Sequence, residues 1–278
     1  MRNSIWLFSI ATGAIMAAPM GHANAAAPDK STYDSRLFFT PHPSVGLQLG
    51  NVYSIADSIK GDGLDEQVLR MSGTSLYKVA AVDAGEVTLL YAHRYDGRPA
   101  SAGRVEIQDN GKTACAKGKC HTYSDASGVM FNALLWGVPP RSIEVGTTWN
   151  VAIPQPWEMG PAAQQKVTVI SINPASHSVT VLREGSGTGY VADEVAANKI
   201  QRDGRTYAVE LTPGPSHWKG YTTFKEGFVQ SDELIMERPV TLASKELGTL
   251  HAFERTYMLL DAMPADSLSD ADIKLPPS

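Results

Sequence analysis

Four side chains of the types that carry out acyl transfer lie close together in the sequence: His121, Ser124, Asp125 and Ser127. A serine hydrolase combines a nucleophilic serine, a histidine base and a carboxylate that orients the histidine. Members of such a triad normally come from separate elements, whereas polar side chains this close in sequence are typical of one turn. The chain also has no Gly-x-Ser-x-Gly nucleophile elbow. The spacing therefore favours a turn, and catalysis there is the alternative.

A second group of chemically capable side chains consists of carboxylates, Glu226, Asp232, Glu233 and Glu237. Paired carboxylates hydrolyse glycosidic bonds when they are held several ångströms apart across a cleft. In an extended strand, Glu233 and Glu237 would share one face. Arg238 follows Glu237 directly, so the pattern favours a solvated strand face over a catalytic pair.

The two cysteines of the chain, Cys115 and Cys120, are separated by Ala-Lys-Gly-Lys. Gly118 permits a tight turn that brings the two sulfurs together, so we expect a local disulfide. The alternative is a metal site formed by both cysteines and His121, but adjacent residues of an extended chain point apart. We expect neither a metal nor a cofactor, since no His-x-x-x-His or His-x-His pair occurs.

A glycine-rich run over residues 185–189 is the one pattern that suggests a nucleotide loop. It lacks the third glycine of a dinucleotide-binding loop and the Gly-Lys-Ser/Thr of a P-loop. We therefore interpret it as a strand connection.

The N-terminus has the order of a secretory signal peptide. Arg2 precedes an apolar run over residues 5–18, and Ala23-Asn24-Ala25 provides a small-residue cleavage site. The run is shorter than the roughly 20 residues that span a bilayer as a helix. We expect cleavage after Ala25, with Ala27 as second choice and an uncleaved anchor as the alternative. The mature protein is then periplasmic or secreted and has no integral membrane segment.

The composition excludes one class of partner. The formal net charge is −5, and no cluster of Lys and Arg interleaved with aromatic residues occurs. Nucleic-acid-binding proteins usually carry such a basic surface. We therefore expect no nucleic-acid partner.

Alternating apolar and β-branched segments, separated by turn residues, predict β-hairpins along most of the chain. The three clearest hairpins pair 76–82 with 87–95, 166–172 with 178–182, and 233–243 with 249–260. Further strands are expected over 104–108, 147–153 and 218–230, the last interrupted by a bulge at Gly227. Helical spacing is confined to 64–71 and 191–200.

These elements predict a mainly β fold, a large curved antiparallel sheet built from hairpins with one or two short helices. The sheet forms a half-barrel, a barrel or a sandwich. The expected organisation is a signal peptide (1–25), an N-terminal arm with an irregular lead-in (26–63), a single β-rich domain (64–260) and a flexible tail (261–278).

Part of this pattern resembles known secreted proteins. The strands at 78–83 and 87–90 and the strand entry Val145-Gly146-Thr147-Thr148-Trp149 are similar to those of uncharacterised secreted bacterial β-proteins. Some of those resemble the half-barrel of the periplasmic lipoprotein-carrier family, which shelters acyl chains against a curved sheet. The resemblance spans roughly residues 64–260, and it implies no particular ligand residue.

The function that we expect is non-enzymatic binding of an apolar ligand, an acyl chain or a lipid, or of an envelope partner on the concave side of the sheet. If this side is hollow, Trp136, Trp149 or Trp218 should line it.

Two alternatives stay open. One is an exported hydrolase whose site assembles from distant residues, with His121, Asp125, Asp232 and Glu233 as the first candidates. The other is a purely structural envelope protein.

Overall fold

The computed structural model describes residues 31–84, 86–108, 129–153, 163–187, 198–270 and 273–276. The predicted signal peptide (1–25), both cysteines and the turn predicted around His121 to Ser127 lie outside these residues. Strands make up most of the described chain, so the mainly β class is confirmed. The elements in chain order are β1 (Tyr33–Asp34), α1 (Arg36–Phe39), β2 (Gln48–Lys60), β3 (Gln67–Asp83), β4 (Glu86–Tyr95), β5 (Ser101–Gln108), α2 (Ala133–Trp136), β6 (Ser142–Ile143), β7 (Thr148–Ile153), β8 (Ala163–Asn173), β9 (Ser178–Gly187), β10 (Asn198–Arg202), β11 (Arg205–Pro213), β12 (Ser216–Lys225), β13 (Phe228–Ser244), β14 (Gly248–Ala262) and the 3₁₀ helix η3 (Ala265–Asp270).

Twelve of these strands form one antiparallel sheet. Its main path runs β5-β4-β3-β2-β14-β13-β12-β9-β8-β7, and the β10–β11 hairpin joins through β13. Among the described strands, β5 and β7 are the two ends of this path and do not pair, so the sheet is an open curve and not a closed barrel. β1 and β6 form a separate two-stranded sheet.

The three predicted hairpins are confirmed. β3 pairs with β4, β8 with β9 and β13 with β14, each through the turn residues that the sequence placed between them. The strands expected over 104–108 and 147–153 correspond to β5 and β7.

The expected strand over 218–230 is two strands. Glu226 and Gly227 both have positive φ, 53° and 79°, and connect β12 to β13. Two successive left-handed residues form the tight hairpin turn that matches the twist of the flanking strands. The bulge predicted at Gly227 is therefore wrong, because Gly227 turns the chain back on itself.

Neither predicted helix is described as a helix. Residues from Gln67 onward belong to β3, where antiparallel pairing with β2 satisfies the backbone. Ile200 lies in β10, and 191–197 fall outside the described residues. The α-helices in the described part of the chain are single turns, α1 and α2.

The lead-in and the tail are more ordered than their composition indicates. The lead-in contains β2, which lies between β3 and β14 in the sheet. The tail continues β14 to Ala262, forms η3, and buries Ile273 against Leu76 and Ala92.

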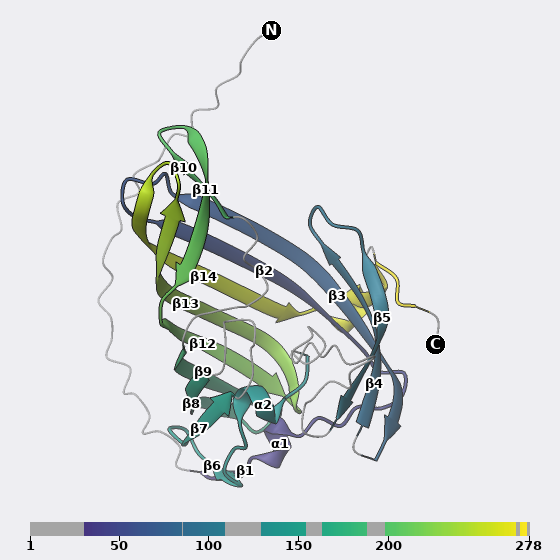
Figure 1. The fold of residues 1–278 in the computed structure, drawn as a ribbon. Coiled ribbons are helices and arrows are strands. Elements are labelled where there is room, and N and C mark those ends of the chain that lie inside the picture. Colours follow the sequence, from purple (N-terminus) through teal and green to yellow (C-terminus); the bar gives the residue numbers. More distant parts are fainter. Residues whose placement is uncertain are drawn as a thin grey trace, which may run out of the picture.

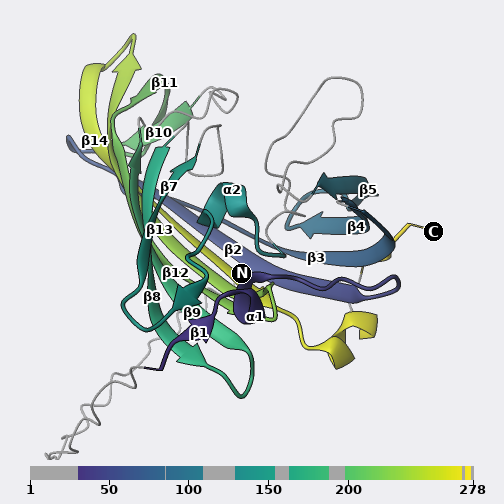
Figure 2. The same ribbon diagram turned by 90° about the horizontal axis from the view of Figure 1, so that it is seen from below.

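The sheet bends around the two short helices, as Figures 1 and 2 show. We call the face against which α2 packs the inner face and the opposite one the outer face. Strand register assigns each side chain to a face, because successive residues of a strand point to opposite sides.

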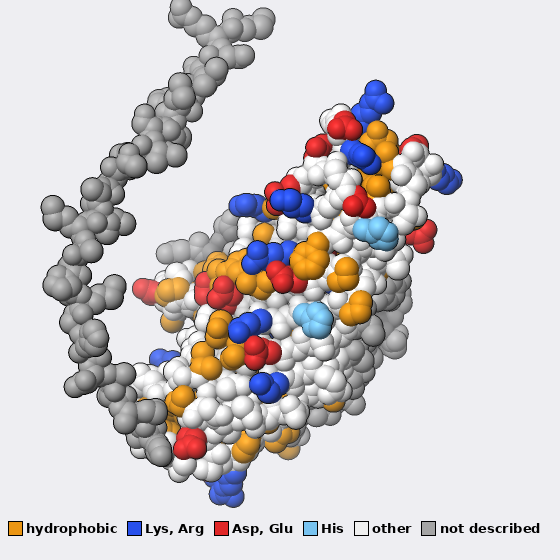
Figure 3. Space-filling view, turned by 90° about the vertical axis from the view of Figure 1, so that its left-hand side faces the viewer, with side chains coloured by type: hydrophobic (Ala, Val, Ile, Leu, Met, Phe, Trp, Pro, Cys, Tyr) orange, Lys and Arg blue, Asp and Glu red, His pale blue; other side chains and the backbone are white. Residues whose placement is uncertain are grey.

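The outer face is exposed over β12, β13 and β14, whereas the C-terminal residues cover Leu76 and Ala92 on the outer side of β3 and β4. Register places the exposed Tyr221 and Phe253 on the exposed part, together with the Glu237–Arg255 ion pair. Figure 3, which looks at the molecule from the left of Figure 1, shows hydrophobic side chains scattered among charges of both signs.

Three clusters of buried side chains cover parts of the inner face. The largest lies between the helices and β7, β8, β9, β12 and β13. A second lies on β3, β4 and β5, and a third lies at the β10–β11 end. The inner face of β2, β3 and β14 between these clusters is less completely covered.

Candidate functional site

The helix α2 fills one end of the hollow formed by the curved sheet. Asn132 caps its start, because the side chain accepts a hydrogen bond from the Leu134 N–H at 2.9 Å. Gly137 ends it with a φ of 71°, and a Cβ at this position would lie 2.6 Å from Val151 Cγ2. The glycine therefore serves both the helix end and its close approach to β7.

A chain of polar contacts joins α2 to the sheet beneath it. Trp136 Nε1 donates to Thr222 Oγ1 at 3.1 Å, and Thr222 Oγ1 donates to Asp232 Oδ1 at 2.7 Å. Arg183 Nη2 donates to Asp232 Oδ2 at 2.7 Å, and the Arg183 guanidinium carbon lies 5.5 Å from the centre of the Trp136 ring. Arg183 is only 2% exposed, so this is a buried ion pair next to an aromatic face.

Backbone carbonyls of α2 receive two further side-chain donors. Trp149 Nε1 donates to the Trp136 oxygen at 2.6 Å, and Gln165 Nε2 donates to the Leu135 oxygen at 2.9 Å. Trp218 Nε1 donates to Gln165 Oε1 at 3.0 Å. These contacts satisfy helix carbonyls that a single turn leaves without intrahelical partners.

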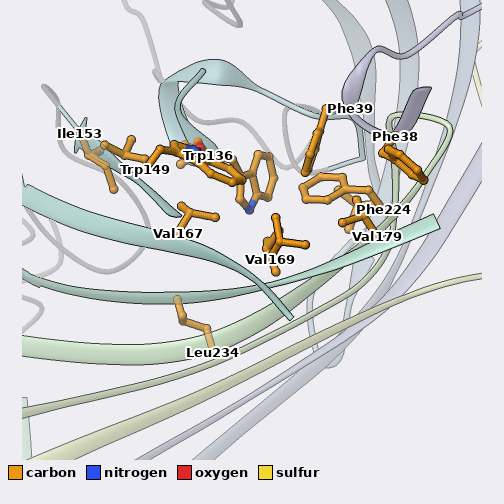
Figure 4. Packing of buried hydrophobic residues seen from close by; sticks show 14 of the residues in the cluster. Phe38, Phe39, Trp136, Trp149, Ile153, Val167, Val169, Val179, Phe224 and Leu234 are labelled. Carbon is orange, nitrogen blue, oxygen red and sulfur yellow. The ribbon is translucent and has the colours of Figure 1, made fainter. Parts of the chain in front are cut away.

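The structure brings together the three predicted tryptophans and buries all of them. Trp136, Trp149 and Trp218 are 1%, 9% and 3% exposed and belong to one core cluster. Figure 4 shows the Trp136 ring pointing from α2 toward Val167 and Val169. The tryptophans fill this end of the hollow. Whether they also contact a ligand stays a prediction.

The candidate hydrolase residues do not converge where they are described. Asp232 points to the inner face, whereas Glu233, its neighbour in β13, points to the outer face. His121 and Asp125 lie outside the described residues. Asp232 is also occupied by Arg183 and Thr222, so its geometry is that of a structural carboxylate.

A cavity of about 660 Å³ lies on the inner side, where α1 and the chain after it face the β3–β4 turn. A β-bulge in β3 between Val79 and Ala81 shifts the register, so Val82 pairs with Val87 and both side chains reach the cavity. Its lining is mostly apolar: Phe39, Pro41, Pro43, Val82, Val87, Ile107, Met130, Phe131, Ala133, Val138 and Pro139, with Ser35, Arg36, Thr40, His42, Asp83, Glu86 and Asn132.

Of the polar residues in this lining, Arg36, Thr40, His42 and Asp83 are exposed, whereas Ser35 and Asn132 are buried. Arg36 is held by Asp34, to whose Oδ2 its Nη2 donates at 2.6 Å. That contact lowers the pKa of Asp34 to about 2. An apolar interior with charge at the mouth suits a ligand with an apolar body.

The open part of the inner face surrounds Asp57 on β2. Register places Asp57 opposite Leu69 of β3 and Thr256 of β14, and Thr256 Oγ1 donates to Asp57 Oδ1 at 3.0 Å. Leu69 is 70% exposed. We call Ile55, Leu69, Met71 and Met258, which surround Asp57, the inner floor.

Asp57 lies beside a buried ion pair, in which Arg238 donates from Nε to Glu254. Burial, together with the nearby Glu254 charge, raises the pKa of Asp57 to about 6, although the Thr256 hydrogen bond and the Arg238 charge oppose the shift. Asp57 is thus a carboxyl group held in partly apolar surroundings.

The buried ion pairs were missed at the sequence level. Arg183 follows Val179 and Val181 at strand spacing, so the alternation itself places it on the buried face. Nothing in the sequence identifies Asp232, 49 positions away, as its partner.

The described residues lack two further features, a metal-binding cluster and a membrane-spanning helix. No group of three or more His, Cys, Asp or Glu side chains in the described ranges is arranged to hold a metal ion. No helix within the described part of the chain is long and apolar enough to cross a membrane.

Comparison with known proteins gives no family. No protein-family model matches the chain. No curated protein matches it.

Two solved structures are similar in part. One is a structure of lipid-protein interactions in lipovitellin, which is similar to this chain with a TM-score of 0.38 and 10% identity over 81% of this chain. This chain spans about a quarter (26%) of that chain. The other is an outer membrane channel from Pseudomonas putida, at a TM-score of 0.18 and 10% identity, covering 80% of this chain and 97% of that one. TM-scores at this level carry no functional argument.

Proposed function

We propose that this is an exported, non-enzymatic protein that holds an acyl chain or another lipid on the inner side of its curved sheet. The observation that carries the proposal is the cavity of about 660 Å³ with its largely apolar lining. Cavities of this size accommodate small apolar ligands. Export rests on the sequence of residues 1–25.

The expected affinity follows from the apolar surface that the ligand removes from water when it binds. Burying about fifteen methylene-sized groups contributes roughly 12 kcal/mol. Lost translational and rotational freedom opposes this by about 4 kcal/mol or more. The difference corresponds to a dissociation constant of about 1 μM or weaker. A shorter chain should bind more weakly by a regular increment per carbon.

The test is a titration of the purified protein with a fluorescent fatty acid, followed by displacement with palmitate and with phospholipid. Val82→Trp adds a ring to the cavity wall, and Val82 is 42% exposed, so the fold should tolerate it. Val68→Trp is the matched control, because Val68 lies in the same strand, is 48% exposed and points to the outer face.

We expect Val82→Trp to weaken fatty-acid binding at least tenfold and Val68→Trp to change it less than twofold. Equal binding by both variants would remove the cavity as the site. No binding by the unmodified protein would remove the proposed function itself.

A further inference from the structure

Among the described charged side chains of the inner face, Asp57 is the one outside the ion pairs. In the described strands of the main sheet path, register places five charged residues on this face, Asp57, Arg183, Asp232, Arg238 and Glu254. Four of them form two ion pairs, Arg183–Asp232 and Arg238–Glu254. None of the ion pairs found among the described residues includes Asp57, whose carboxylate accepts a hydrogen bond from Thr256 and lies near the Arg238–Glu254 pair.

The surroundings of Asp57 are apolar and accessible. Ile55 precedes it by two positions on the same face, and Met71 and Met258 lie diagonally across the neighbouring strands. These three side chains are half-buried, and Leu69, directly opposite, is mostly exposed. A sheet face with exposed aliphatic side chains around one carboxyl group offers both an apolar contact and a point charge.

We propose that the inner floor is a second binding site, which takes a cationic amphiphile whose ammonium group pairs with Asp57 and whose alkyl chain lies on Ile55, Met71 and Met258. An ammonium group would pair with the Asp57 carboxylate, whereas an anionic head would be repelled by it. A divalent metal ion does not fit, since such ions require several oxygen ligands and no group of three or more His, Cys, Asp or Glu side chains in the described residues is arranged to hold one.

The charge of the site depends on pH through Asp57. The titratable and charged groups that face it are Glu254 on β14 and Arg238 on β13, and Thr256 supplies a hydrogen bond. Burial raises the pKa of Asp57 to about 6. The carboxylate is therefore present at pH 8 and protonated at pH 5, so the ammonium should lose its partner in the acidic range.

The experiment uses calorimetric titration of the full chain with decyltrimethylammonium and with decyl sulfate, each below its micelle concentration, at pH 8. We expect the cation to bind at least tenfold more tightly than the anion. Asp57→Asn should weaken cation binding at least tenfold, and Asp261→Asn, on the outer face of β14, should leave it unchanged. At pH 5 the unmodified protein should bind the cation as weakly as Asp57→Asn does.

A second variant guards against misfolding of Asp57→Asn. Leu69→Lys places an ammonium opposite Asp57 at a mostly exposed position, and it should abolish cation binding. Val68→Lys, on the outer face, is its control. Equal binding of cation and anion, or full cation binding by Asp57→Asn and Leu69→Lys, would overturn the inference.

The Val82→Trp variant separates this site from the cavity. Cation binding should survive in that variant, even if fatty-acid binding is lost or never occurs. Loss of cation binding in Val82→Trp with retention in Asp57→Asn would instead assign the cation to the cavity and overturn the inference.

Discussion

Removing the carboxylate of Asp232 should destabilise the protein strongly. Arg183, at 2% exposure, would keep its charge in the interior without the oxygens that now accept its hydrogen bonds. Thr222 would lose the acceptor of its hydroxyl proton, and Trp136 is bonded to that hydroxyl. The damage would therefore extend from the ion pair to the attachment of α2.

The expected magnitude comes from other buried ion pairs. Deleting one partner of such a pair typically costs about 3–5 kcal/mol. The Asp232 side chain is 18% exposed, which allows some relief by water, so we expect about 3 kcal/mol for Asp232→Ala. Asp261→Ala, on the outer face of the neighbouring strand, should cost less than about 0.5 kcal/mol.

Urea denaturation followed by circular dichroism measures these free energies of unfolding. The double variant Arg183→Met with Asp232→Leu should recover most of the loss, because apolar replacement of a whole buried pair is often neutral. A loss below about 1 kcal/mol for Asp232→Ala, or a double variant as unstable as the single one, would refute this account of the network.

Three further predictions concern the floor, a close contact and the cysteines. Because the pKa of Asp57 is raised from 3.8 to about 6, the folded state binds the Asp57 proton more tightly than the unfolded state. Protonation of Asp57 therefore stabilises the fold fully below pH 4, and this stabilisation is lost as the pH rises through 6. Asp57→Asn should remove this pH dependence in unfolding curves measured from pH 4 to 8. Gly185→Ala should cost about 2 kcal/mol in urea denaturation, because a Cβ there overlaps the Trp218 ring, and an unchanged midpoint would contradict this packing. Cys115 and Cys120 should resist a thiol reagent in the denatured protein, isolated from the periplasm, until a reductant is added, and two freely labelled thiols would refute the bridge.

Local signals explain how much of the fold the sequence predicts. Alternation and turn residues suffice for the three hairpins, since both partners lie within a short stretch of chain. The wrong prediction at Gly227 shows the limit of this reasoning, because a glycine in a strand pattern fits a bulge as well as a turn. The pairing of β2 with β14 joins residues about two hundred positions apart, for example Asp57 and Thr256, and no local pattern reports it.

The candidate site depends still more on remote contacts. Trp136 and Thr222 are 86 positions apart, and Trp218 and Gln165 are 53 apart. The sequence predicts that the tryptophans line the inner side if it is hollow, but only the position of α2 decides that they fill the hollow at its end. The cavity is likewise assembled from α1, the β3–β4 turn and the chain around α2.

The central claim, that the inner side holds a lipid or acyl chain, is tested most directly by native mass spectrometry of the protein purified from a bacterial envelope without detergent. We predict a bound species with the mass of a lipid, released on denaturation and identified in the extract, and strongly reduced in Val82→Trp but not in Val68→Trp. A protein that carries no such species, and that acquires none after incubation with fatty acids or phospholipids, would contradict the claim.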